Sequence, residues 1–168
     1  MGGGKLSLLE GEKAKISAWN LQGKLNNQSP APLVHRAQPA VVSITQATEL
    51  GTVYTIDEIL AISEVCKQNN LPLHIDGARL ANAIVALGTT VADCTWRAGV
   101  DILSLGATKN GVFAADAVVF FDANKVADFE FRRKRGGHLF SKYRFLSSQL
   151  VPYLESNYWL ELAKNSNH

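Results

Sequence analysis

The sequence of 168 residues has little cysteine, no long apolar run and almost no net charge. Its two cysteines, Cys66 and Cys94, are too few and too far apart for a disulfide framework or a metal-ligand motif. Two free, buried thiols favour a reducing, cytoplasmic compartment. No segment approaches the roughly 18–20 apolar residues that span a bilayer, and the first residues lack the pattern of a secretory signal. We therefore expect neither a membrane span nor a secretory leader.

The charge balance argues against a nucleic-acid-binding protein. Lys and Arg number 17 and Asp and Glu 15, giving a net charge of +2, whereas binding along a phosphate backbone needs a basic excess. The basic run at 132–135 lacks interleaved aromatic residues, and it also suits the last turn of a helix. With 46% hydrophobic and 19% charged residues, the chain has the composition of a globular domain.

Apolar patterning predicts strands that alternate with helices. The helix after Thr55 carries a capping box completed by Glu58, and it ends near Asn69. The other expected elements are strands at 5–9, 40–45, 73–76, 100–105 and 117–121, helices at 13–25, 80–87, 91–97, 124–135 and 140–162 (the last bent or split at Pro152), a polar connector at 26–39 and a loop at 106–111. This order predicts an α/β fold with a mostly parallel sheet covered by helices on both faces.

Three charged residues lie at the carboxyl ends of predicted strands, where α/β proteins commonly have their ligand-binding and catalytic residues. Asp76 closes one strand, Arg79 opens the following helix, and Lys109 lies in the loop after the next strand. Each has a simpler interpretation alone, since Asp76 could cap the helix and Lys109 could be a solvated charge. Together they suit pyridoxal phosphate chemistry, in which a lysine forms a Schiff base, an acid pairs with the ring nitrogen and an arginine grips a substrate carboxylate.

Four segments carry a resemblance to a known family. They are LPLHIDGARLANA (71–83), DILSLGATKNG (101–111), VVSITQATELGTVYT (41–55) and RRKRGGHLFSKYRFLSSQ (132–149). The chain resembles the β-eliminating lyase/threonine aldolase family of fold-type-I pyridoxal-phosphate enzymes from about residue 40 to residue 165. The resemblance implies the central part of a fold-type-I large domain and a homodimer or homotetramer.

The activity implied by the resemblance is that of an aldehyde-lyase. It would cleave L-threonine or L-allo-threonine to glycine and an aldehyde by retro-aldol chemistry, with pyridoxal phosphate as cofactor and no metal. Two alternatives stay open. One is a β-eliminating lyase acting on another amino acid, and the other is a non-catalytic fragment of such an enzyme.

The resemblance also implies roles for particular residues. Asp76 would bind the pyridine nitrogen, Lys109 would bond the cofactor covalently, and Arg79 would contact both cofactor and substrate carboxylate. Thr108 and Ser104 are candidates for the cofactor phosphate, although ordinary loop hydrogen bonds would explain both.

Expectations for five further residues complete the set. Glu49 takes the place of a histidine that some relatives use on the substrate hydroxyl, and it could act as a general base or be an exposed turn carboxylate. Arg135 could contact the cofactor phosphate across a dimer interface, and His138 could contact cofactor or interface. His74 shares a sheet face with Asp76 and is expected to be a packed or hydrogen-bonded core residue, while His35 is expected at the surface.

Two parts of the family pattern are absent from the sequence. Neither the histidine that stacks on the cofactor ring nor the Gly-rich phosphate loop can be found, and the opening Gly2–Gly4 does not precede a helix start. The resemblance therefore predicts a chain truncated at both ends. Residues 1–39 would be an N-terminal segment and connector of the large domain, 40–168 its cofactor-binding core, and the C-terminal small domain would be missing.

Overall fold

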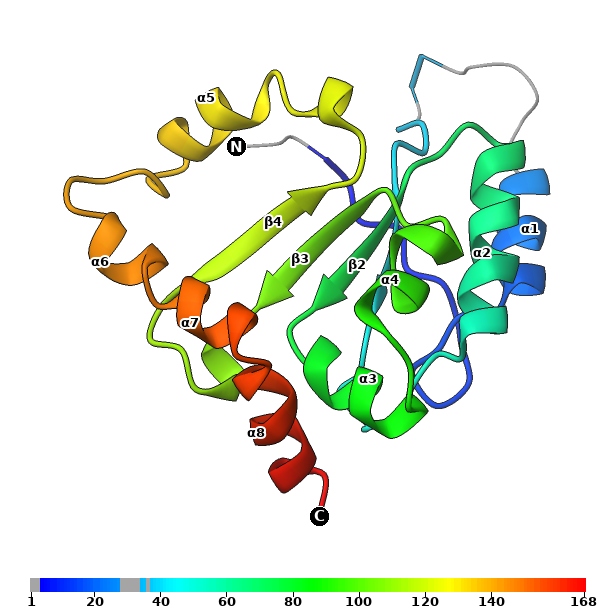
Figure 1. Ribbon diagram of the computed structural model, residues 1–168. Coiled ribbons are helices and arrows are strands. Elements are labelled where there is room, and N and C mark those ends of the chain that lie inside the picture. Colours follow the sequence, from blue (N-terminus) through cyan, green and yellow to red (C-terminus); the bar gives the residue numbers. More distant parts are fainter. Residues whose placement is uncertain (1–3, 28–33, 36) are drawn as a thin grey trace.

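Within the residues that the structure describes, the sheet has four strands, which do not all run in the same direction (Figure 1). The structure is a computed structural model that describes residues 4–27, 34–35 and 37–168. The strands are β1 (Val42–Thr45), β2 (Leu73–Gly77), β3 (Ile102–Gly106) and β4 (Asp116–Phe120), and they lie in the order β1-β2-β3-β4. The first three run parallel and β4 is antiparallel to β3. The predicted α/β class and mostly parallel sheet are thus confirmed.

Helices connect and flank the strands. They are α1 (Ala18–Asn26), α2 (Ile56–Gln68), α3 (Leu80–Leu87), α4 (Val91–Cys94), α5 (Phe129–Arg135), α6 (Arg144–Ser147), α7 (Leu150–Glu155) and α8 (Tyr158–Ser166), with 3-10 turns η1 (Trp96–Ala98), η2 (Thr108–Asn110) and η3 (Ala123–Lys125). The predicted capping box of α2 is present, because the Thr55 hydroxyl accepts from the Glu58 N–H and the Glu58 carboxylate accepts from the Thr55 N–H.

The two faces of the sheet differ in burial. Val42 and Ile44 on β1 are buried, and the same alternation along β2 and β3 buries one side of the sheet in a single core with α2 and α3. On the other side, Ser43, Asp76 and Val118 are exposed. The prediction of a sheet covered on both faces was therefore wrong for the described residues. Short apolar runs are typical of strands that are buried on both faces, which is why the sequence suggested two covered faces. In the structure the polar residues within these runs face outward.

The cysteines behave as small buried hydrophobes, as expected. Cys66 and Cys94 are both free and buried. Burial raises the pKa of each thiol to about 11, and nearby Asp101 and Asp93 respectively add to that rise. Thiols held in this way stay protonated at neutral pH and are poor nucleophiles.

The amino-terminal predictions were partly wrong. Residues 5–9 form no strand, and the helix expected over 13–25 begins later, as α1, because Ser17 caps it by accepting from the Asn20 N–H. The connector expected over 26–39 falls largely on residues 28–33 and 36, which lie outside the described part of the chain.

Several predicted helices are broken or shortened. The helix expected over 91–97 divides into α4 and η1 at Thr95, where φ is −127° and ψ is −104°. The helix expected over 140–162 becomes α6, α7 and α8, and the last break falls at Asn157, whose φ is +57°. Pro152 lies within the first turn of α7, where proline is tolerated, so it makes no break there.

Candidate active site

The predicted site residues Asp76, Arg79 and Lys109 lie at the carboxyl ends of two neighbouring parallel strands. Asp76 is the penultimate residue of β2, Arg79 is the N-cap position of α3, and Lys109 is in η2, just after β3. Asp76 and Lys109 are exposed and Arg79 is half-buried, so all three side chains can reach a bound molecule. The register pairs Asp76 with Ser104 of β3, which places the lysine loop beside the Asp76 turn.

Two glycines allow the turn and the lysine loop to approach closely. A Cβ at Gly106 would lie 2.7 Å from the Ala78 Cα atom, and one at Gly77 would lie 2.9 Å from the Ser104 carbonyl oxygen. Real Cβ atoms do not tolerate such distances to backbone, so no side chain fits at either position without a shift. The glycines of Asp-Gly-Ala-Arg and of the β3 end therefore permit the Asp76 turn and the segment before Lys109 to pack closely.

The Asp76 carboxylate is oriented by its own turn. Its Oδ1 atom accepts a hydrogen bond of 3.1 Å from the Ala78 N–H, an arrangement typical of Asx turns. Its backbone carbonyl accepts from the Gln46 N–H at 2.9 Å. The turn uses one acceptor position of the carboxylate, so Asp76 can still accept a hydrogen bond from a protonated ring nitrogen. A residue that only capped the helix would not need this remaining capacity.

The loop that carries Glu49 is closed by a buried glutamine. Gln46 is fully buried, and its amide donates to the Tyr54 carbonyl and accepts from the Tyr54 N–H, both at 2.9 Å. Glu49 at the exposed tip reaches the Arg79 guanidinium, with Nη1 and Oε1 3.4 Å apart. The structure therefore brings Glu49 to the same edge as Arg79, although the contact is long and its carboxylate is largely exposed.

His74 forms a hydrogen-bonded bridge across the sheet. Its Nδ1 lies 2.8 Å from the Ser43 hydroxyl and its Nε2 lies 2.9 Å from the Ser104 hydroxyl. Burial lowers the pKa of His74, and the negative charge of Asp76 opposes that shift. His74 is thus the hydrogen-bonded residue that was predicted. Ser104, a phosphate candidate, lies within β3, in the strand expected there, and is already a partner of His74.

The lysine loop is fastened at several points. The Ala107 N–H donates to the Asp116 carboxylate at 3.0 Å, and the Asn110 amide donates to Tyr153 and Trp159. Sequence reasoning missed Asn110 and Gln46 because both were assigned to loops. The one available signal for Asn110 was its place directly after Lys109 in the motif.

Other candidates lie apart from this cluster. Because β4 is antiparallel, it ends at the opposite edge of the sheet, and α5 with Arg135 follows there (Figure 1). Arg135 and His138 are exposed. Both follow the end of β4 that lies opposite the lysine loop, so contact of either with a cofactor at Lys109 remains a prediction that requires a second chain. His35 is exposed as expected, and Thr108 is exposed within η2.

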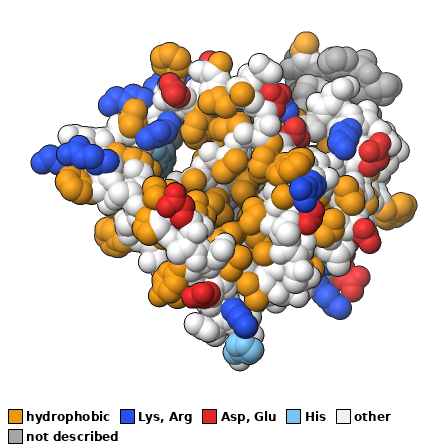
Figure 2. Space-filling model, in the orientation of Figure 1, with side chains coloured by type: hydrophobic (Ala, Val, Ile, Leu, Met, Phe, Trp, Pro, Cys, Tyr) orange, Lys and Arg blue, Asp and Glu red, His pale blue; other side chains and the backbone are white. Residues whose placement is uncertain are grey.

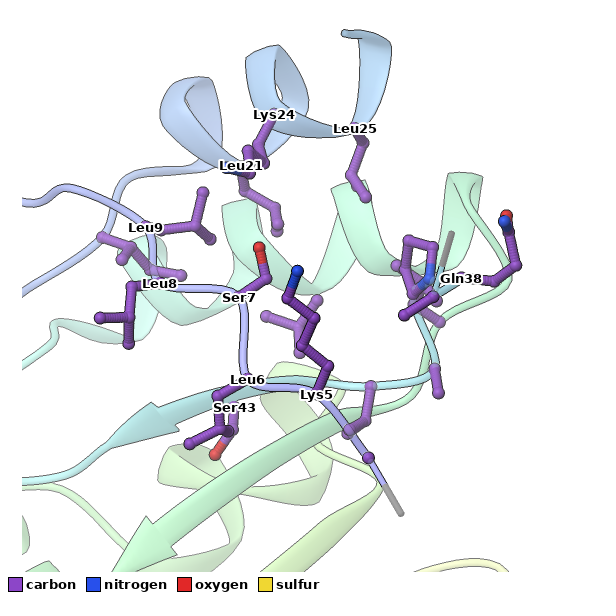
Figure 3. A pocket seen from close by; sticks show the side chains of 18 of the residues that line it. Lys5, Leu6, Ser7, Leu8, Leu9, Leu21, Lys24, Leu25, Gln38 and Ser43 are labelled. Carbon is purple, nitrogen blue, oxygen red and sulfur yellow. The ribbon is translucent and has the colours of Figure 1, made fainter. Parts of the chain in front are cut away.

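A separate apolar cavity lies on the far side of β1. It has a volume of about 1060 Å³ and is walled by Leu6, Leu8 and Leu9 together with Leu21 and Leu25 of α1 (Figure 3). None of the three central candidates lines it. Within the described residues no group of three or more His, Cys, Asp or Glu could hold a metal ion, and no helix is long and apolar enough to cross a membrane.

The described residues form an α/β domain with an acid and a lysine at the carboxyl ends of neighbouring strands of a mostly parallel sheet. A sequence profile of the beta-eliminating lyase family matches residues 1–167. The chain therefore belongs to that family.

Individual relatives agree with this assignment. A low specificity L-threonine aldolase of Pseudomonas sp. (strain NCIMB 10558) is 50% identical over 135 residues, covering 80% of this chain and 39% of the relative. That of Pseudomonas aeruginosa is 43% identical over 166 residues, covering 98% and 47%. The threonine aldolase structure from Leishmania major superposes with a TM-score of 0.80 at 30% identity, over 91% of this chain and 44% of the other. The chain thus spans less than half the length of these relatives.

Proposed function

We propose that this chain is the lysine-bearing part of a pyridoxal-phosphate-dependent aldehyde-lyase that cleaves L-threonine or L-allo-threonine to glycine and acetaldehyde. The observation that carries the proposal is the close packing of the Asp76 turn against the β3 end, since Lys109 lies in the turn that follows β3 and Arg79 begins α3. Relatives that bear the name L-threonine aldolase support the same activity.

The residues present fit the cofactor. Pyridoxal phosphate needs an amine for its aldehyde, an anion for its ring nitrogen and donors for its phosphate. Lys109 offers the amine and Asp76 the anion, and the close approach that Gly106 permits sets them at one edge of the sheet. Thr108, Ser104 and, from a second copy, Arg135 remain the proposed phosphate donors. When bound, the cofactor supplies an electron sink for the pair of electrons released from the substrate.

Three side chains of this chain have separate roles in the proposed reaction. Arg79 binds the substrate carboxylate through its planar guanidinium. Glu49, already in contact with Arg79, accepts the proton of the substrate β-hydroxyl as the Cα–Cβ bond breaks. Asp76, held by the Ala78 N–H, keeps the ring nitrogen protonated.

We further infer that residues 40–168 form the core of the cofactor-binding domain, that the protein assembles as a homodimer or homotetramer, and that it acts in the cytoplasm. Large exposed aromatic side chains from α5 to α6 support self-association, since exposed apolar residues gathered in one region often mark interfaces. Phe131 and Phe145 expose 70% and 65% of their area, and Figure 2 shows hydrophobic side chains interspersed with Lys and Arg over this segment. The free, buried thiols favour the reducing compartment.

The products of the reaction test the proposal. The protein loaded with pyridoxal phosphate is mixed with L-threonine, and acetaldehyde and glycine are quantified. We expect both products in equal amounts, a strong loss in Glu49→Gln of about 10²–10⁴-fold, as expected for a lost general base, and no loss in Glu64→Gln, an exposed carboxylate on α2. Release of a keto acid and ammonia in place of acetaldehyde would assign the site to β-elimination.

A further inference from the structure

The lysine loop is tied to a part of the chain that lies far from it in sequence. The side-chain amide nitrogen of Asn110 donates to the Tyr153 hydroxyl at 2.7 Å and to the Trp159 carbonyl at 2.8 Å. Tyr153 and Trp159 are each only 5% exposed, and their rings pack with centroids 6.3 Å apart. Both protons of one amide nitrogen are therefore used on acceptors that the α7–α8 pair holds in fixed places.

A second tie lies three residues further on. Gln149 accepts from the Phe113 N–H and donates to the Phe113 carbonyl, both at 3.1 Å. Between the two ties, Gly111 has a φ of +103°, and a Cβ there would touch the Leu162 side chain at 3.0 Å. Residues 110–113 are thus held against α7 and α8 at both ends of the segment.

Lys109 belongs to the same turn as the first tie. It precedes Asn110 directly within the one-turn helix η2, and its own side chain is exposed. A lysine side chain has a flexible stem, so the place of its amine depends on where the backbone is held. Reaction between an amine and a carbonyl carbon is sensitive to errors of about 1 Å in that place.

We propose that Asn110 is a positioning residue: by bonding Tyr153 and Trp159 it fixes the backbone of Lys109 at the distance from which the amine reaches the cofactor aldehyde. The proposal rests on the proposed function, because it takes Lys109 as the residue that bonds the cofactor. It makes α7 and α8, which lie outside the sheet, part of the apparatus that places the lysine.

A purely structural role would give different results. Asn110 could simply stabilise the packing of α8, and its loss would then lower stability without changing how Lys109 reacts. The chain offers a matched control in Asn69, whose side-chain amide donates to the Val65 carbonyl at 2.8 Å at the end of α2. Asn69→Ala removes a bond of the same type away from the lysine loop.

The test measures Lys109 itself. Wild type, Asn110→Ala, Tyr153→Phe and Asn69→Ala are mixed with pyridoxal phosphate, the yellow absorbance is followed against pH, and borohydride traps the adduct for peptide mapping. We expect trapping on Lys109 to slow by about tenfold in Asn110→Ala, because the free energy of one to two lost hydrogen bonds corresponds to a change of about that size. In the same variant we expect the pH midpoint of the yellow absorbance to change, because the Lys109 amine has a different environment.

The smaller variants decide between the roles. Tyr153→Phe keeps the aromatic ring and leaves the bond between Asn110 and the Trp159 carbonyl in place, so we expect trapping to slow, but by less than in Asn110→Ala. Asn69→Ala should match wild type. Equal trapping rates and equal pH midpoints in Asn110→Ala, Tyr153→Phe and wild type would overturn the positioning role and leave the proposed function intact. Absence of any label on Lys109 in wild type would instead overturn the proposed function, and the inference with it.

Discussion

Two regions of this chain differ sharply in how much of them the fold covers. Residues 73–115, which carry Asp76 and Lys109, include most of the core of β2, β3 and α3, whereas no residue of 121–152 is buried. The first region is held by strand pairing, close glycine contacts and buried anchors. The second is an arm around one side of the sheet, rich in exposed Phe, Lys and Arg (Figures 1 and 2). The comparison shows that the segments of Asp76 and Lys109 are anchored within the chain, while the arm leaves apolar and basic side chains exposed.

The largest expected effect comes from truncating one side chain in each region. Ile75 is fully buried beside Asp76, so Ile75→Ala leaves a cavity and should cost about 2–5 kcal/mol of unfolding free energy. Phe131 is 70% exposed, so Phe131→Ala should stay within about 0.5 kcal/mol. Urea unfolding of both variants in dilute solution measures the difference. Similar losses would show that the arm is as firmly packed as the site.

A second effect should arise at the contact between the Asp76 turn and the lysine loop. Gly106→Ala puts a Cβ 2.7 Å from the Ala78 Cα atom, so the two backbones must part, at a cost of about 1–3 kcal/mol. Gly23→Ala is the matched control, because nothing lies within 4 Å of its Cβ position in α1. The control should gain about 0.5–1 kcal/mol. A neutral Gly106→Ala would mean that the turn and the loop are not pressed together.

The smallest expected effect is a pH dependence from His74. Because burial lowers its pKa below the ordinary 6.5, the unfolded chain binds a proton that the folded chain resists, so stability falls as pH drops below about 6.5. His74→Gln removes this contribution but keeps a hydrogen-bonding side chain. Between about pH 7.5 and 5.5 the wild type should therefore lose more stability in urea unfolding than the variant. An equal loss in both would exclude His74 as the source.

Local patterns predicted local structure well. Thr55 and Glu58 predicted the start of α2 because a capping box is satisfied by neighbouring backbone alone. The strand that ends at Asp76 was equally clear, since its apolar residues stand between a proline and a glycine. The candidate site followed from the rule that parallel strands end at one edge, which needs only the order of the elements.

What could not be predicted depends on contacts between distant segments. The left-handed φ of Asn157 separates α7 from α8, and asparagine can adopt that conformation or a helical one, so its identity alone did not fix the break. The pairing of Arg79 with Glu49 and the anchoring of Asn110 join segments far apart in the chain, so spacing gives no sign of them. The exposed second face of the sheet was missed because short apolar runs look alike whether one or both faces are buried.

The central claim is that the β2 turn and the lysine loop form one cofactor site, and one measurement tests it most directly. The protein is mixed with pyridoxal phosphate and reduced with borohydride, and the labelled peptide is identified by mass spectrometry. The account predicts a single label on Lys109, absent in Lys109→Ala and weakened when Asp76→Ala removes the anion for the ring nitrogen. Labels spread over surface lysines such as Lys125 and Lys164, with none preferred at Lys109, would contradict it.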